Sequence, residues 1–287
     1  MLSIVTWFVQ AQQLPKSTFF YLNPQQYNPA YTGFAENTTL FTQYRLQMAG
    51  LPNSPTTLSA SLDMPLPDYK AGLGVMLTND IVNIIGQTGG RVSYAYYLTL
   101  AKDQHVGFGL SMGVNKMQIL YDRIVADEPS ELTQVYNYKP FTSFNSDIGI
   151  MYEIYDLEVG FSVNNLFSTR NNVYFNQLPY RPLPQYGVMF RSKYDVDMDW
   201  TLITSGSARS PQGSPIVYDF NIVGQWREWG WVGLNYGKSN NIGLILGGKK
   251  KNLSLIYAWE FPFSALSKTT FGAHELMIRY AFEKPIK

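Results

Sequence analysis

The strongest constraint on this chain is a two-residue alternation of apolar and polar side chains, repeated across residues 70–282. In residues 158–164, for example, Val159, Phe161 and Val163 alternate with Glu, Gly, Ser and Asn. Successive side chains of a β-strand point to opposite faces, so each such stretch predicts a strand with one apolar and one polar face. Repeated with polar turns between the stretches, the pattern predicts an all-β fold.

The alternation predicts roughly fourteen antiparallel strands. Their expected ranges are 37–47, 56–64, 70–79, 87–100, 104–117, 143–154, 157–165, 184–194, 197–207, 216–226, 230–237, 241–248, 252–261 and 272–282. The apolar positions are large and often aromatic, while the opposite positions are often Gly, Ser, Asn or charged. An apolar exterior around a polar lumen is the arrangement of an outer-membrane barrel. We therefore predict a transmembrane antiparallel outer-membrane β-barrel, located in the cell outer membrane and in contact with its lipid.

Composition is consistent with this fold. The chain has 22 Lys and Arg against 21 Asp and Glu, so no charge excess indicates a nucleic-acid partner. Aromatic residues make up 15%, which is typical of the girdles at the two membrane interfaces. An aromatic-rich sugar-binding protein is the alternative. The absence of cysteine excludes a disulfide framework, a thiolate metal site, a catalytic thiol and a lipoprotein anchor.

The two ends of the chain suggest separate segments. Residues 1–11 are apolar and end in Val9-Gln10-Ala11, which predicts a signal peptide cleaved before Gln12. Basic residues do not precede the apolar stretch, so we expect a truncated start; an internal strand is the alternative. The chain contains no run of 18 apolar residues, so the sequence predicts no transmembrane helix. The expected organisation is completed by a periplasmic plug segment at 12–36, the barrel at 37–282 and a periplasmic tail at 283–287.

The connections between the predicted strands alternate in length. Short links follow the even-numbered strands, whereas links such as 118–142 and 166–182 follow odd-numbered ones. Short turns on one rim and long loops on the other predict that the short side is periplasmic. Ser239–Asn240 is an exception to the alternation.

A barrel of this size needs material inside it. Eight strands can be filled by side chains and sixteen leave an aqueous channel. The aromatic stretch 19–33 contains two Asn-Pro pairs and is expected to pack into the periplasmic mouth as a partial plug; a flexible leader is the alternative. Glycines in the predicted strands would either leave lumen space or relieve curvature. They are Gly107, Gly109, Gly113, Gly149 and Gly160.

The sequence offers little catalytic or metal-binding chemistry. Its two histidines, His105 and His274, form no metal-binding pair, and no Walker loop or nucleophile elbow is present. We therefore predict no enzyme activity and no cofactor. A hydrolase triad of Ser267, His274 and Asp219 remains an alternative.

Two charged stretches also have functional and structural interpretations. The acidic residues of the longest connection, Asp127, Glu128 and Glu131, suggest either calcium binding or a solvated loop. The basic turn Lys249–Lys251 suggests either contact with lipid headgroups or a partner, or simply a hydrophilic turn.

A series of motifs resembles the PorP/SprF family, outer-membrane proteins of the Bacteroidetes type IX secretion and gliding motility system. The series begins with Asn28-Pro29-Ala30-Tyr31-Thr32-Gly33 and ends with Gly272-Ala273-His274-Glu275 and Tyr280-Ala281-Phe282. Between them lie Arg45-Leu46-Gln47, Pro55-Thr56-Thr57, Asp63, Leu73-Gly74-Val75 with Asp80, Ser93-Tyr94-Ala95-Tyr96 and Gly160–Leu166. Met48 stands where the family usually has Trp, and five residues follow the last aromatic residue, Phe282.

The resemblance implies a function and a set of residues. It implies a non-enzymatic barrel that binds the type B C-terminal domain of a secreted, adhesin-like surface protein, and supports its secretion and attachment alongside other secretion components. The motif residues, structural or partner-binding, are Asn28, Pro29, Ala30, Tyr31, Gly33, Arg45, Gln47, Asp80, Asn164, Asn165, His274 and Glu275. Strand parity predicts a lumenal ion pair between Glu275 and Arg279. The alternative is a FadL-like or porin-like transport channel, although no apolar lumen lining is evident.

Overall fold

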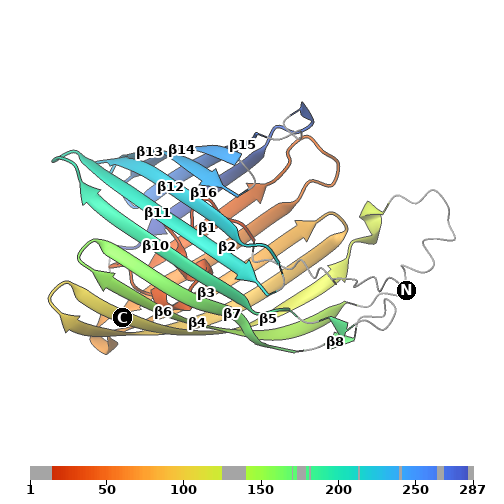
Figure 1. Cartoon of the computed structure of the whole chain (residues 1–287), viewed down its shortest axis with the longest axis horizontal. Coiled ribbons are helices and arrows are strands. Elements are labelled where there is room, and N and C mark those ends of the chain that lie inside the picture. The colour runs from red at the N-terminus through yellow and green to blue at the C-terminus, as the bar shows by residue number, and fades with distance from the viewer. Residues whose placement is uncertain are drawn as a thin grey trace, which may run out of the picture.

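The protein forms a closed β-barrel of fourteen antiparallel strands (Figure 1). The computed structural model describes residues 15–124, 140–169, 171–172, 179–180, 182–212, 214–238, 241–263 and 268–283. Within these residues, no helix is both long and apolar enough to cross a membrane. The predicted fold class and approximate strand number are confirmed.

Every predicted strand range overlaps one strand of the barrel. The barrel strands are β1 (Thr39–Leu46), β2 (Thr56–Leu66), β3 (Ala71–Val82), β4 (Ile85–Ala101), β5 (Gln104–Ile119), β6 (Phe141–Ile154), β7 (Leu157–Ser168), β10 (Gln185–Asp195), β11 (Trp200–Pro211), β12 (Val217–Trp226), β13 (Gly230–Gly237), β14 (Asn241–Lys250), β15 (Leu253–Pro262) and β16 (Ala273–Ala281). A separate two-stranded sheet pairs β8 (Asn171–Asn172) with β9 (Pro179–Tyr180). Four short 3-10 helices are η1 (Pro24–Gln26), η2 (Pro29–Tyr31), η3 (Pro67–Tyr69) and η4 (Tyr121–Arg123).

Pairing between the first and last strands closes the sheet. Strands β1 and β16 run antiparallel, with Thr39 opposite Ala281 and Leu46 opposite His274. Each other barrel strand pairs with the barrel strands before and after it in sequence. Closure leaves no unpaired barrel edge, which a spanning sheet requires because the hydrocarbon region offers no hydrogen bonds to free backbone groups.

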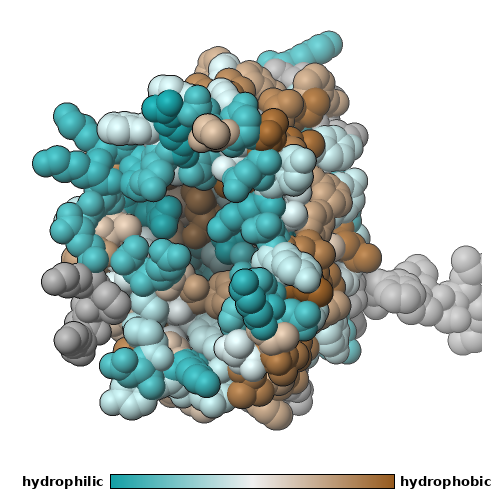
Figure 2. All heavy atoms as spheres, turned by 90° about the vertical axis from the view of Figure 1, so that its left-hand side faces the viewer, coloured by the Kyte–Doolittle hydropathy of each residue, from teal (hydrophilic) through white to brown (hydrophobic). Residues whose placement is uncertain are grey.

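The two faces of the wall follow the sequence alternation. In β13, Trp231, Gly233 and Asn235 are buried toward the lumen, while the residues between them are exposed apolar side chains. The same alternation places the even-numbered residues from Val92 to Leu100 on the outer face. Hydrophobic residues cover one flank in Figure 2, beside a hydrophilic rim with a hollow at its centre.

The two rims differ in the length of their connections. The short-turn rim carries residues 67–70, 102–103, 155–156, 196–199, 227–229 and 251–252. The opposite rim, which we call the long-connection rim, joins strand ends as far apart in sequence as Ile119 and Phe141. Its described residues are 47–55, 83–84, 120–124, 140, 169, 171–172, 179–180, 182–184, 212, 214–216, 238, 263 and 268–272. The two-residue turn at 83–84 is a further exception, because β3 and β4 both extend beyond their predicted ends.

Candidate functional site: a lumen filled by the N-terminal segment

Residues 15–36, which we call the lumenal segment, pass through the barrel interior; they are the first coloured part of the chain in Figure 1. Lys16 lies near the long-connection rim, beside Asp219 at the start of β12. From there the segment runs toward the short-turn rim as far as Tyr21, whose carbonyl accepts a 2.6 Å hydrogen bond from Arg191. The segment turns back toward the long-connection rim at η1, and then runs through η2 to the short-turn rim, where β1 begins. The path therefore extends well beyond the single mouth expected from the sequence.

An ion cluster holds the beginning of the segment. Arg45 of β1 pairs with Glu260 of β15 at 2.9 Å and with Glu275 of β16, and all three side chains are at least 98% buried. Lys16 joins the cluster through Glu260 at 2.8 Å. The Thr18 hydroxyl donates to Glu260 at 2.6 Å. Because buried carboxylates need compensating charge and hydrogen bonds, the segment and the wall satisfy each other's polar groups here.

The pairing of Glu275 differs from the sequence prediction. Its carboxylate accepts from Arg45 and from the backbone N–H of Thr18, not from Arg279. Arg279 instead lies over the ring of Phe41, with 5.9 Å between its Cζ atom and the ring centroid. The alternation along β16 correctly placed both charges inside the barrel. The pairing of β1 with β16, however, makes Arg45 the direct cross-strand neighbour of Glu275.

Below the ion cluster the lumen contains an apolar core. Phe19 and Phe20 are fully buried, and they belong to one cluster with inward-facing side chains of the wall. The wall residues are Phe41, Met151, Met189, Ile203, Val223, Trp231, Ile245, Ile256, Ala258 and Met277. The expectation that the lumen lacks an apolar lining is therefore wrong. The apolar residues are scattered singly over many strands, so no one stretch of sequence reveals them together.

The Asn28–Gly33 motif fixes the second descent of the segment. The Asn28 side chain accepts from Ala30 N–H at 2.9 Å, capping η2, and donates to the carbonyl oxygens of Ile150 and Phe161 at 3.2 Å each. Pro29 occupies the first helical turn, where its missing N–H costs nothing. Tyr31 is 2% exposed, and Gly33 adopts a positive φ of 69°.

Strand glycines provide the space that this descent occupies. An added Cβ at Gly109 would lie 2.2 Å from the backbone nitrogen of Ala30, and one at Gly149 would lie 1.9 Å from Oδ1 of Asn28. Gly160 likewise faces the ring of Tyr31. Of the two interpretations of these glycines, lumen space for the segment is the one that their contacts support.

A β-bulge organises the Asn164-Asn165 motif of β7. The register between β6 and β7 shifts beside Asp147, and Asn165 adopts a left-handed φ of 56°. The Asp147 carboxylate accepts from Asn165 N–H at 2.9 Å and from Arg91 at 3.0 Å. Asn164 is 2% exposed, and its Nδ2 has no partner among the described residues. Asparagine suits the bulge because it tolerates left-handed backbone better than most residues.

The bulge gives a stability prediction. Replacing Asn165 with valine should destabilise the barrel by about 1–3 kcal/mol, because a β-branched residue strains a left-handed position. Replacing it with glycine should cost less, since glycine adopts this backbone freely. Thermal unfolding in detergent, followed by circular dichroism, tests the order of the two midpoints. Equal midpoints would show that the backbone at Asn165 carries no strain.

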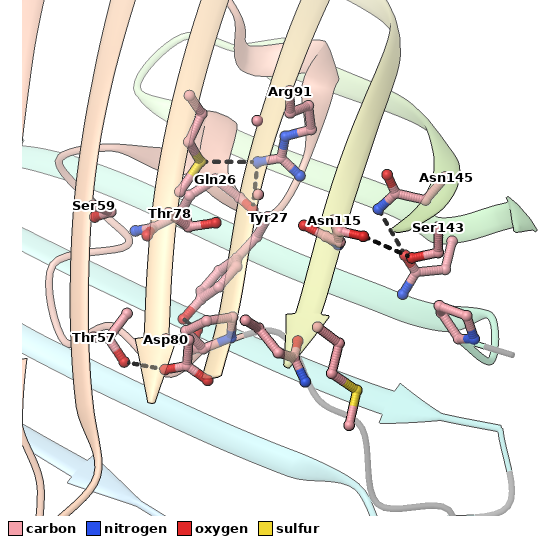
Figure 3. Close-up of a pocket in the computed structure, with 18 of the residues that line it drawn as sticks. Gln26, Tyr27, Thr57, Ser59, Thr78, Asp80, Arg91, Asn115, Ser143 and Asn145 are labelled. Atoms are coloured by element: carbon pink, nitrogen blue, oxygen red, sulfur yellow. Dashed lines mark hydrogen bonds between the residues drawn. The ribbon is translucent and has the colours of Figure 1, made fainter. Parts of the chain in front are cut away.

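Two cavities lie on opposite sides of the lumenal segment. The outer cavity, toward the long-connection rim, has a volume of about 110 Å³ and is lined by Gln26 and Tyr27 of the segment (Figure 3). The inner cavity, toward the short-turn rim, has a volume of about 730 Å³ and is lined by Tyr21 and Leu22. Figure 2 looks onto the short-turn rim. Residues of the segment thus line both cavities.

The walls of the two cavities differ in chemistry. The outer cavity carries mostly amides and hydroxyls, with Asp80 accepting a hydrogen bond from Thr57. The inner cavity carries many charged residues, including Arg191, which pairs with Glu158 at 2.6 Å. At the turn of this rim, a hydrogen bond from Lys249 lowers the pKa of Glu228 below its ordinary value. Lys249 of the basic turn is therefore paired within the chain.

The remaining motif residues lie at the long-connection rim. Gln47 follows β1, and its N–H donates to the Pro55 carbonyl at 2.8 Å. His274 belongs to the outer face, where Nδ1 lies 2.6 Å from the Tyr257 hydroxyl and the ring stacks on Trp259. Asp219 is 1% exposed on the lumenal face. The barrel wall thus separates His274 from Asp219, so these two cannot form a triad.

Some predictions lie outside the described residues. They concern the signal peptide at 1–11, Ser267, and the acidic residues Asp127, Glu128 and Glu131. Within the described part of the chain, no group of three His, Asp or Glu side chains is placed to hold a metal ion.

Several lumenal residues were not singled out as site residues from the sequence. Lys16, Glu260 and Arg209 form the far side of the ion cluster together with Asp219, which the sequence suggested only as part of a hydrolase triad. Arg209 and Asp219 are separated by 3.7 Å. The available signal was a charged residue at an inward position of an alternating strand, as at Glu260. Parity reveals that such a charge is lumenal, but it does not identify its partner.

Comparisons with known proteins agree with this architecture. The sequence model of the family described as "Type IX secretion system membrane protein PorP/SprF" matches residues 9–280. No curated protein sequence matches the chain. The Ralstonia pickettii toluene transporter TbuX is similar in structure, with a TM-score of 0.53, 9% identity, and coverage of 92% of this chain and 93% of TbuX.

A second solved structure is a FadL homologue from Pseudomonas aeruginosa, with a TM-score of 0.51 and 12% identity, covering 89% of this chain and 93% of the homologue. The CymD monoaromatic hydrocarbon channel gives a TM-score of 0.51 and 10% identity, covering 92% and 94%. At such identities the likeness concerns the barrel fold alone.

Proposed function

Because this chain belongs to the PorP/SprF family of type IX secretion system membrane proteins, we propose that it binds the C-terminal domain of a secreted surface protein and supports its secretion and cell-surface attachment. The protein is an outer-membrane β-barrel. The proposed role needs no chemical reaction at the barrel, and gliding motility is one process it would serve.

The observation that carries the proposal is the filled lumen. From Ser17 to Tyr21 the lumenal segment is almost completely buried, and both ends of this stretch are hydrogen-bonded to the wall. A barrel whose interior is occupied in this way is better suited to present surfaces than to pass solutes. We assign the long-connection rim to the cell exterior, where its connections and the outer cavity would contact the secreted partner.

Recovery of a partner tests this proposal. Affinity-tagged, full-length protein extracted from native outer membranes should co-purify with a secreted surface protein bearing a type B C-terminal domain. Deleting the barrel should retain that protein inside the cell or release it to the medium. Finding no such protein in the purified complex, together with unchanged surface display in the deletion strain, would contradict the proposal.

A transport channel is the second candidate. The apolar lumenal cluster and the fold likeness to hydrocarbon transporters favour it. The lumenal segment opposes it, because Phe19 and Phe20 already cover the cluster. We expect the purified barrel in a planar bilayer to show no steady open-pore conductance. Sustained conductance, or uptake of a monoaromatic hydrocarbon by vesicles containing the barrel, would instead support transport.

A further inference from the structure

We propose that the outer cavity receives one basic side chain of a polypeptide, with Asp80 pairing with its ammonium or guanidinium group. This inference rests on the proposed function, since the secreted partner supplies the polypeptide. It assigns a cation-binding role to a carboxylate that makes no ion pair within the described chain.

Asp80 supplies the uncompensated charge of the cavity. It lies near the end of β3 at the long-connection rim, and Thr57 donates to its carboxylate (Figure 3). No basic side chain of the described residues lies within ion-pair distance of it. The other two charged lining residues already have partners, since Lys16 pairs with Glu260 and Arg91 pairs with Asp147 at 3.0 Å. An incoming cation would therefore be attracted to Asp80.

Two buried amides line the same cavity with unused hydrogen-bonding atoms. Gln26 is 6% exposed and Gln43 is 5% exposed. The Nε2 donor of Gln26 and the Oε1 acceptor of Gln43 have no partner among the described residues. Leaving such groups unpaired away from water is costly. The lumen around the cavity is therefore polar, which favours a polar occupant, and the secreted partner of the proposed function would supply it as a side chain of a polypeptide.

The size of the cavity limits what can enter. Its volume of about 110 Å³ is below the roughly 300–1,000 Å³ of sites that enclose small organic ligands. The polar lining also differs from the apolar cluster deeper in the lumen. A single polar residue is therefore the occupant that the cavity suits.

Binding of the co-purified partner to the full-length barrel in detergent tests this inference. Asp80→Asn should weaken binding about tenfold, because it removes a partly buried charge partner. The matched control is Asp156→Asn, which removes the same charge from the exposed turn 155–156 on the opposite, short-turn rim. This control should change the dissociation constant less than about twofold. Circular dichroism confirms that both variants fold.

A charge-reversal experiment identifies the occupant. One Lys→Glu or Arg→Glu substitution in the partner should weaken binding to the wild-type barrel about tenfold, and Asp80→Lys should restore that binding. This arm tests the inference even if Asp80→Asn does not fold. Spermidine serves as the free-cation probe. Binding of spermidine at Asp80, with no partner residue showing the effect, would overturn the polypeptide assignment in favour of a free polyamine.

The outcomes separate the two proposals. If the wild-type barrel binds a secreted partner but Asp80→Asn and Asp156→Asn bind it equally well, the cavity assignment is overturned while the proposed function stands. If the wild-type barrel recovers no secreted partner, the proposed function fails, and the cavity assignment fails with it.

Discussion

Replacing Arg45 with methionine is expected to destabilise the barrel by about 3–5 kcal/mol and to release the start of the lumenal segment. The substitution leaves Glu260 and Glu275, each 1% exposed, without the arginine that they share, while Lys16 still pairs with Glu260. Two buried carboxylates facing each other repel, and water would have to enter to solvate them. Because Ser17 and Thr18 hydrogen-bond these same carboxylates, the segment should detach with them.

Two measurements check this result, with an exposed ion pair as the control. The thermal midpoint should fall clearly, and a protease added to the folded protein should cut near Lys16 in the variant but not in the wild type. Arg227→Met is the control, since it breaks the exposed pair between Arg227 Nε and Asp199 Oδ1, 2.6 Å apart at the short-turn rim. Exposed pairs contribute little to stability, so this variant should resemble the wild type.

A combined variant distinguishes lost charge balance from lost packing. Adding Glu260→Gln and Glu275→Gln to Arg45→Met removes the uncompensated charges and should recover part of the midpoint. An Arg45→Met variant with an unchanged midpoint and an uncut segment would show that the ion cluster does not hold the segment in place.

The barrel itself was predictable from the sequence because its signal is local. Each strand meets lipid on one face and the lumen on the other, so a stretch such as 253–261 records both environments in consecutive residues. Range ends were less predictable where a strand continues past its last large apolar residue. Strand β11 continues to Pro211. Its last residues, which include the lumenal Arg209, do not alternate with large apolar residues, so the sequence pattern does not mark this end of the strand.

The interior could be predicted only in part. The aromatic, proline-interrupted stretch indicated that the N-terminal region would be buried, but its path depends on partners far away in sequence. Arg45 and Glu260 are separated by 215 positions. Their meeting requires closure between β1 and β16 and a register that no local pattern encodes. The predicted Glu275–Arg279 pair is wrong for the same reason, since closeness along one strand does not identify the partner across the seam between β1 and β16.

The motifs that carry the family resemblance mostly meet at the packing of the segment against the wall. Asn28 and Ala30 lie against Gly149 and Gly109, and Gly33 donates its N–H to Asp63. These contacts hold one end of the lumenal segment against the barrel wall, and the ion cluster holds its other end. Asp80 is different, because its carboxylate lines an open cavity and, among the described residues, accepts a single hydrogen bond, from Thr57.

Gly109→Ala is accordingly expected to displace η2 and to destabilise the barrel by about 1–3 kcal/mol, the usual cost of overpacking. The new Cβ would lie 2.2 Å from both the Ala30 nitrogen and the Pro29 carbonyl carbon. These are backbone atoms, and the Asn28 side chain fixes them through its cap and its bonds to the wall. They cannot rotate away as a side chain would, so the segment must shift as a unit.

Gly90→Ala provides the matched control for this displacement. Gly90 lies on the neighbouring strand β4, and its new Cβ would only reach ordinary contact, 3.4 Å from the side chain of Leu77. We expect a lower thermal midpoint and faster proteolysis within residues 15–36 for Gly109→Ala alone. Both substitutions add the same methyl group to a strand glycine, so strand propensity cancels in the comparison. If the two variants had the same thermal midpoint and the same rate of proteolysis within residues 15–36, the close contact between η2 and the wall would not be what holds the segment in the lumen.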